Sequence, residues 1–215
     1  MATVVKRIGA EVLTVWCLSA SLFLWGCKHA QEEQTPSLER PPSPVFSLAP
    51  EVDAILRNKL ELLQPLVQDP QILAAVRTAN QTHAKLDEAA IEQLERRFQN
   101  EPLSSPFLHT LLETSAAEVL KTFQKKNPGF AAIFVTDRYG LIVAATNKTT
   151  NYYQAGEHWW RQTFRAGCWY GAIEYDESSQ TEAVPLYVLI RDPTTAEPLG
   201  TLKAVFRLEA IIEEL

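Results

Sequence analysis

The chain has 215 residues, of which 46% are hydrophobic and 21% charged, as in a globular protein and unlike a disordered, collagen-like or multi-pass membrane protein. Lys and Arg number 20 against 26 Asp and Glu, giving a formal net charge of -6. A mildly acidic chain without a long basic run has no means of displacing phosphate counterions, so no nucleic acid is expected as a partner. Three cysteines and four scattered histidines also argue against a disulfide scaffold and a zinc enzyme.

Residues 1–26 have the pattern of a secretory signal peptide. Lys6 and Arg7 precede a mostly apolar, uncharged run from Val12 to Gly26. A helix of about 15 residues, at ~1.5 Å each, spans roughly 22 Å, which is less than the ~30 Å hydrocarbon core of a bilayer. A basic segment before so short an apolar run indicates export rather than a stable transmembrane helix.

The apolar run ends in Leu24-Trp25-Gly26-Cys27, which resembles the lipobox of bacterial lipoproteins. The resemblance implies that Cys27 is acylated and becomes the new N-terminus. The alternative is an uncleaved anchor in which the cysteine is incidental. Residues 27–50 are rich in proline and poor in apolar side chains, so they are expected to form a tether rather than a core. Lys28 follows the cysteine where similar inner-membrane lipoproteins carry aspartate, which favours the outer membrane and a domain facing the periplasm.

Residues 51–128 are predicted to be helical. A first apolar stripe has spacings of three and four residues and consists of Leu56, Leu60, Leu63 and Val67. A second stripe runs from Leu86 to Phe98. Ser105-Pro106 has the form of a helix start, and the stripe from Phe107 to Phe123 predicts one further helix that ends before Pro128-Gly129.

The period of the apolar residues changes near residue 130, so residues 129–215 are predicted to form a sheet. The strands are expected at 130–136, 141–146, 170–175, 184–191 and 199–207, with a turn at 137–140 and helices at 155–166 and 208–215. The sequence therefore predicts an α+β fold in which a long N-terminal helical arm packs on an antiparallel sheet of about five strands. Residues 51–215 are expected to form a single domain.

Several segments resemble the Cache family of PAS-like, PDC-type extracellular sensor domains. They are the strand–turn–strand segment Ile133–Ala144, the segment Thr149–Trp160 (TTNYYQAGEHWW), Tyr175-Asp176-Glu177-Ser178, and the closing segments Val188–Asp192 and Pro198–Gly200. The resemblance covers roughly residues 51–215. It implies a PAS-like sheet with a ligand pocket on one face, walled by the loop and helix that follow the second strand.

Polar aromatic side chains are concentrated in the segment where the resemblance places that pocket. Such side chains can wall a pocket and supply a few directed hydrogen bonds. The candidate ligand-binding residues are Tyr152, Tyr153, Glu157, Trp159, Trp160, Tyr175 and Asp176. The alternative is that the tryptophans are core residues that fasten the short helix to the sheet.

Other notable residues have simpler explanations than a functional role. Asp137 and Gly140 are of the types that begin and close a turn. His158 has no second His or Cys in its segment, so no metal is expected there. Nothing indicates a catalytic triad, a phosphate-binding loop or paired catalytic carboxylates. We therefore expect neither an enzyme nor a cofactor.

These features favour a lipid-anchored, small-molecule-sensing or ligand-binding module without an output domain of its own, acting through a partner signalling protein. The alternative is a structural or assembly lipoprotein that uses the same fold as an interaction surface. Amino-acid-sensing members of the family resembled carry an arginine for the ligand carboxylate where this chain has Glu157. Because glutamate repels a carboxylate, we expect an amine or another carboxylate-free ligand, unless Glu157 caps the helix or points to solvent.

Overall fold

The computed structural model describes residues 49–215. The predicted signal peptide, the candidate lipidation site Cys27 and nearly all of the predicted tether therefore lie outside the described residues. Within residues 49–215, no helix is both long enough and apolar enough to cross a bilayer.

Five helices precede the first strand. They are α1 (Pro50–Val67), α2 (Pro70–His83), α3 (Glu88–Asn100), α4 (Pro106–Leu112) and α5 (Ser115–Lys126). Four of them, α2 to α5, begin at a short polar side chain that accepts a backbone N–H of the first turn. Asp69, for example, accepts the Gln71 N–H at 2.8 Å, and Ser105 accepts that of Leu108 at 3.2 Å. Proline in the first turn of α1, α2 and α4 suits positions where no intrahelical N–H bond is made.

The single helix expected after Ser105 is in fact two helices, α4 and α5. Thr114 has an extended backbone, with φ -87° and ψ 164°, and its hydroxyl accepts the Ala117 backbone N–H at 3.2 Å. This N-cap starts a new helix, because the extended residue ends one set of helical hydrogen bonds and the hydroxyl satisfies an amide of the next. The apolar stripe continues across the break, which is why periodicity alone did not indicate it.

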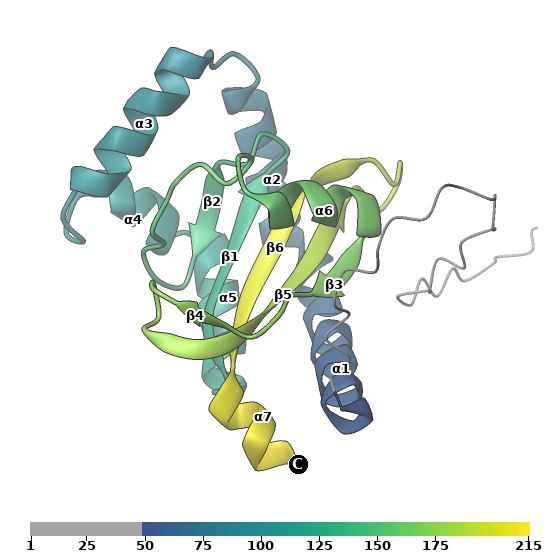
Figure 1. Cartoon of the computed structure of the whole chain (residues 1–215). Coiled ribbons are helices and arrows are strands. Elements are labelled where there is room, and N and C mark those ends of the chain that lie inside the picture. The colour runs from purple at the N-terminus through teal and green to yellow at the C-terminus, as the bar shows by residue number, and fades with distance from the viewer. Residues whose placement is uncertain (1–48) are drawn as a thin grey trace, which may run out of the picture.

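The remaining elements form a six-stranded antiparallel sheet and two helices (Figure 1). The strands are β1 (Phe130–Asp137), β2 (Ile142–Ala145), β3 (Cys168–Tyr170), β4 (Glu174–Asp176), β5 (Thr181–Arg191) and β6 (Pro198–Arg207), with α6 (His158–Ala166) and α7 (Leu208–Glu214). The strand order is β2-β1-β6-β5-β3, and β4 also pairs with β5. The predicted α+β architecture, a helical arm packed on an antiparallel sheet, is confirmed.

The strand expected at 170–175 is interrupted and forms two short strands, β3 and β4. Tyr170 pairs with Leu186 and Glu174 pairs with Ala183, so the break lies opposite Pro185 of β5. Proline has no N–H to donate to a neighbouring strand. At this position β5 can therefore offer only the Pro185 carbonyl to the neighbouring chain segment, and this carbonyl accepts the Gly171 N–H at 2.8 Å.

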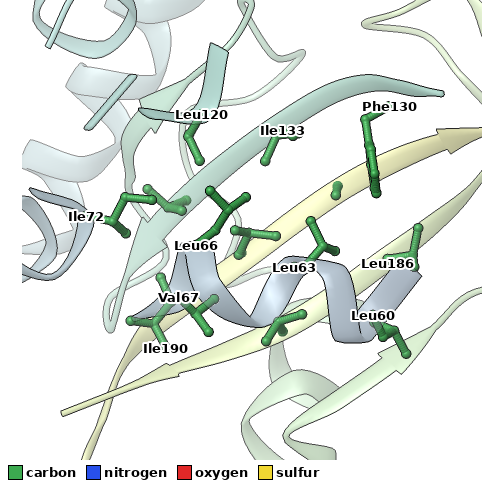
Figure 2. Packing of buried hydrophobic residues seen from close by; sticks show 14 of the residues in the cluster. Leu60, Leu63, Leu66, Val67, Ile72, Leu120, Phe130, Ile133, Leu186 and Ile190 are labelled. Carbon is green, nitrogen blue, oxygen red and sulfur yellow. The ribbon is translucent and has the colours of Figure 1, made fainter. Parts of the chain in front are cut away.

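The two faces of the sheet carry different layers, because side chains alternate along each strand. Ile133 and Val135 of β1 belong to the main core beneath α1, α2 and α5, whereas Phe134 faces the opposite side. Figure 2 shows Leu60, Leu63 and Leu66 of α1 in one core cluster with Leu186 and Ile190 of β5. In Figure 1, α6 lies on the opposite face, and α3 and α4 extend beyond β2. The opposite face, under α6, is where the pocket lies.

Candidate functional site

A pocket of about 470 Å³ opens between α6, the loop before it and the second face of the sheet. Its lining comes from the loop, from α6, and from the strands β3, β4, β5 and β6 or residues beside them. The lining residues are Thr150, Asn151, Gln154, Glu157, His158, Trp159, Gln162, Trp169, Gly171, Ala172, Glu174, Tyr187 and Lys203.

The floor of the pocket is one row of residues that runs across the sheet. Trp169 of β3 is paired with Tyr187 of β5, which is paired with Lys203 of β6, which is paired with Phe134 of β1. Directly opposed residues in neighbouring strands point to the same face and have adjacent side chains. The strand register therefore brings two aromatic rings and one ammonium group together from distant parts of the chain.

Trp159 of α6 covers this row and completes an aromatic stack. Its ring lies 5.0 Å from the Tyr187 ring with an interplanar angle of 14°, and Tyr187 in turn stacks on Trp169 at 4.4 Å and 28°. Thr163 locks the arrangement, because its buried hydroxyl accepts the indole N–H of Trp169 at 3.0 Å and donates to the Trp159 carbonyl at 2.8 Å. Each such ring pair contributes about 0.5–1.5 kcal/mol beyond area burial, so these contacts stabilise the floor.

Lys203 supplies a cation at the floor, and its side chain is only 13% exposed. Its Nζ lies 5.6 Å from the centre of the Trp159 ring and 5.8 Å from that of Tyr187. Its ion-pair partner is Glu174 Oε1 at 3.6 Å, on a side chain that is half exposed. The aromatic rings of the floor are therefore already close to a cation of the protein itself.

Acidic groups surround this lysine. Burial raises the pKa of the Tyr187 hydroxyl, and the negative charges of Glu174, Glu157 and Asp176 raise it further. Burial also acts to raise the pKa of Asp176, but hydrogen bonds from Ser178 and Ser179, together with the charge of Lys203, outweigh it and lower that pKa. Among its Asp, Glu, Lys and Arg residues, the lining carries two carboxylates and one ammonium group, which is a formal excess of one negative charge.

Glu157 is the lining carboxylate without an ion pair among residues 49–215. It is exposed at the rim and is the N-cap residue of α6, but its side chain makes no capping hydrogen bond. The sequence left two alternatives to a ligand role for Glu157, namely that it caps the helix or points to solvent. The Glu157 side chain does not cap α6, but it is exposed to solvent.

The candidate residues predicted from the sequence separate into three groups. Glu157 and Trp159 line the pocket. Tyr152 lies in the core at 3% exposure, 5.6 Å from the rings of both Phe98 and Phe107. Trp160 also lies outside the lining, and its indole N–H donates to Thr136 Oγ1 at 3.1 Å.

The third group lies near the pocket without lining it. Tyr153 and Tyr175 are exposed, at 36% and 61%. Asp176 accepts hydrogen bonds from the backbone N–H and the hydroxyl of Ser179, both at 2.8 Å, and from the Ser178 hydroxyl at 2.7 Å, and thereby closes the turn after β4. The structure therefore brings together two of the seven candidates.

Sequence reasoning missed most of the lining, above all Lys203, Tyr187 and Trp169. One local signal was available for Lys203. A lysine in the otherwise apolar segment Leu202–Phe206 indicates a partly buried cation, which needs a partner. Tyr187 and Trp169 had no comparable signal, because their contribution depends on which strands pair and in what register.

The lining offers binding groups of both charges, amides and aromatic surfaces. Among residues 49–215, no three His, Cys, Asp or Glu side chains gather as a metal site would require. What the arrangement provides is a half-open aromatic pocket with polar groups that can orient a small polar molecule.

No protein-family model and no curated protein matches this sequence. Solved structures that are similar include the sensor domain of the V. cholerae histidine kinase DctB, with a TM-score of 0.46 and 15% identity over 76% of this chain and 53% of that chain. The sensory domain of the Campylobacter jejuni chemoreceptor Tlp3 with isoleucine bound has a TM-score of 0.40 and 13% identity over 76% and 64%.

The ligand-binding domain of the Pseudomonas aeruginosa amino acid chemoreceptor PctC in complex with GABA has a TM-score of 0.42 and 12% identity over 76% and 60%. These are sensor domains of the Cache type, the family that the sequence resembles. This chain spans between about half and two thirds of the length of the three. At such identities the likeness concerns the fold alone.

Proposed function

We propose that this chain is an extracytoplasmic, non-enzymatic module that binds a small molecule and passes the signal to a partner protein. The single observation that carries the proposal is the pocket of about 470 Å³ with an aromatic floor and a polar rim. That volume lies within the range of about 300–1,000 Å³ that small-molecule sites occupy.

The ligand that suits the pocket is a small amine or another cationic, carboxylate-free compound. Lys203 is held by Glu174 at 3.6 Å, so the carboxylate that remains for a ligand is Glu157 at the rim. A ligand carboxylate would meet this group and Glu174 before it reached the ammonium group. Since Lys203 already lies near the rings, the carboxylates rather than the aromatic faces would attract the ligand cation.

Export and anchoring are the second part of the proposal. The signal-like residues 1–26 and the lipobox-like junction at Cys27 support a lipid anchor, and residues 27–50 would then serve as the tether. Two or more acyl chains hold a protein stably on a membrane, where one chain is marginal. The domain would face the periplasm, with the outer membrane favoured by Lys28.

Thermal-shift and calorimetric titration of the purified chain test the ligand proposal. The panel comprises aliphatic amines and diamines, the standard amino acids and dicarboxylates. A compound that binds only the folded state stabilises it by RT ln(1 + [L]/Kd), which is about 2.7 kcal/mol at 100 times Kd. We expect saturable stabilisation by an amine and a weaker response to the matched amino acid.

The substitution Glu157→Gln tests the role of the rim carboxylate, with Glu177→Gln, exposed but outside the lining, as the control. We expect only Glu157→Gln to weaken amine binding. Micromolar binding of an ordinary amino acid that is unaffected by Glu157→Gln would contradict the proposed ligand class. A structural or assembly role would be favoured instead if no compound in the panel bound.

A further inference from the structure

The loop at 146–157, which forms one wall of the pocket, is bonded to a helix far away in the sequence. One carboxylate oxygen of Glu95, in α3, accepts the backbone N–H of Tyr152 at 2.9 Å and that of Tyr153 at 2.7 Å. The other oxygen accepts the side-chain amide of Gln99 at 2.9 Å, which fixes the orientation of the carboxylate. A carboxylate on two backbone amides makes charge-assisted hydrogen bonds, which are stronger than neutral ones.

A second bond runs in the opposite direction, from the loop to the end of the helix. Lys148 Nζ donates to the Glu101 carbonyl at 2.9 Å, and it lies 5.2 Å from the centre of the Phe98 ring. The last carbonyls of a helix have no intrahelical partner, and a cation there also favours the helix dipole. Loop and helix therefore satisfy each other's unpaired backbone groups.

The inner side of the same loop is held by the sheet. The Tyr152 carbonyl accepts the Ile142 N–H at 3.1 Å, and the Gln154 N–H donates to the Gly140 carbonyl at 2.7 Å. The loop is therefore hydrogen-bonded on one side to Glu95 of α3 and on the other side to the hairpin of β1 and β2. Asn151 and Gln154, which flank the two bonded amides, line the pocket.

We infer that Glu95 is a positioning residue for the pocket: through its carboxylate, α3 holds the backbone at Tyr152 and Tyr153 so that Asn151 and Gln154 form the wall. No ligand contacts Glu95 in this arrangement, and its effect is exerted through the loop backbone. The expectation that Glu95 affects ligand affinity rests on the proposed function. The expectation that Glu95 holds the loop backbone does not.

Amide hydrogen exchange of the full chain, measured without any ligand, tests the inference directly. Glu95→Ala removes the acceptor and Glu95→Gln keeps one oxygen without the charge. Glu92→Ala is the matched control, since this exposed glutamate of the same helix has Arg96, one turn away, as its ion-pair partner among residues 49–215. We expect exchange at Tyr152 and Tyr153 to rise roughly tenfold in Glu95→Ala and less in Glu95→Gln, with amides of β5 unchanged. The control should leave both amides at the wild-type rate.

Acrylamide quenching of tryptophan fluorescence adds a readout of the pocket itself, because Trp159 and Trp169 line it. We expect stronger quenching in Glu95→Ala than in Glu92→Ala at an unchanged far-ultraviolet circular dichroism spectrum. The inference is overturned if a folded Glu95→Ala protein, or Glu95→Gln where the alanine variant does not fold, exchanges both amides within twofold of wild type.

The panel compounds separate this inference from the proposed function. If the two amides exchange faster but no compound binds wild type, the positioning role stands and the proposed function fails. If a compound binds wild type and the loosened Glu95→Ala variant with equal affinity, the proposed function stands and the positioning role for ligand binding is wrong.

Discussion

The imidazole Nδ1 of His83 lies 2.6 Å from the Oδ2 of Asp137, a carboxylate with no solvent exposure, and joins the end of α2 to the turn between β1 and β2. The other oxygen of Asp137 accepts the backbone N–H groups of Tyr139 and Leu141, both at 2.9 Å. The turn role predicted for Asp137 is thus realised, and the bond to His83 adds a link between the helical arm and the sheet.

Removal of this carboxylate is expected to destabilise the fold strongly. Asp137→Ala leaves two turn amides without their acceptor, one of them buried, and should reduce the free energy of unfolding by about 2–4 kcal/mol. Asp137→Asn keeps a side-chain oxygen and should cost less. Denaturant unfolding measures both losses. An alanine variant within about 1 kcal/mol of wild type would show that the turn does not depend on this side chain.

Gly140 is expected to tolerate no side chain. Its φ is +83°, and a Cβ there would lie 2.5 Å from the backbone nitrogen of Ala155. Gly140→Ala should lower the free energy of unfolding by about 2 kcal/mol or more, since the left-handed backbone and the contact both oppose it. Gly156→Ala is the control, because nothing lies within 4 Å of its Cβ position. Equal stability of the two variants would contradict the prediction.

Asp192 is expected to contribute an acid-sensitive part of the stability. Hydrogen bonds from the Thr194 backbone N–H, the Arg77 side chain and the Thr195 backbone N–H lower the pKa of Asp192 to about 2. A carboxylate with a depressed pKa stabilises the folded state above its unfolded pKa, and the contribution is lost as the pH falls through the folded value. Unfolding free energies of wild type and Asp192→Asn should therefore differ at neutral pH and converge between about pH 4 and pH 2. A difference that stays constant over that window would refute the assignment.

Lys203→Met is expected to change ligand preference more than it changes folding. Methionine keeps most of the apolar stem beside Trp159 and Tyr187 but removes the charge, so the pocket becomes more negative. Amine affinity should increase roughly three- to tenfold, which corresponds to about 0.7–1.4 kcal/mol. The pKa of Asp176 should rise, because Lys203 helps to lower it. Calorimetry and carboxyl NMR titration measure these effects, and reduced amine affinity would contradict the assignment of a cationic ligand to this pocket.

The lipid anchor is tested by metabolic labelling with a fatty-acid analogue. Cys27→Ser should abolish labelling, since the lipobox-like junction places the acyl chains on this sulfur and on the new N-terminus. Cys17→Ser, within the predicted signal peptide, is the control and should leave labelling intact. Undiminished labelling of the Cys27→Ser chain would exclude this site.

Local signals were sufficient for most of the secondary structure. Ser105-Pro106 begins α4, the apolar period changes at Phe130, where β1 begins, and Asp137 and Gly140 form the expected turn. Each of these features depends on residues within one turn or one strand. The division of α4 from α5 also had a local cause, in Thr114, but the continuous apolar stripe concealed it.

Features that depend on residues far away in the sequence could not be predicted from local patterns. The break between β3 and β4 comes from Pro185, which lies on the partner strand. Trp160 was predicted as a pocket residue, yet its indole N–H donates a hydrogen bond to the Thr136 hydroxyl outside the pocket lining. Neighbours in sequence point in different directions from a helix, so the aromatic pair Trp159-Trp160 divides between the pocket and the layer beside it.

The sequence by itself determined most of the helical and strand segments, the turn after β1 and the aromatic, polar loop before α6, because these depend on spacing and on the residues nearby. Only the tertiary structure decided which side chains form the pocket. Tyr187 meets Lys203 because β5 and β6 pair in that register, and a shift by one residue would turn each to the opposite face. Register is set by the packing of the whole sheet beneath the helical arm, and no segment specifies it alone.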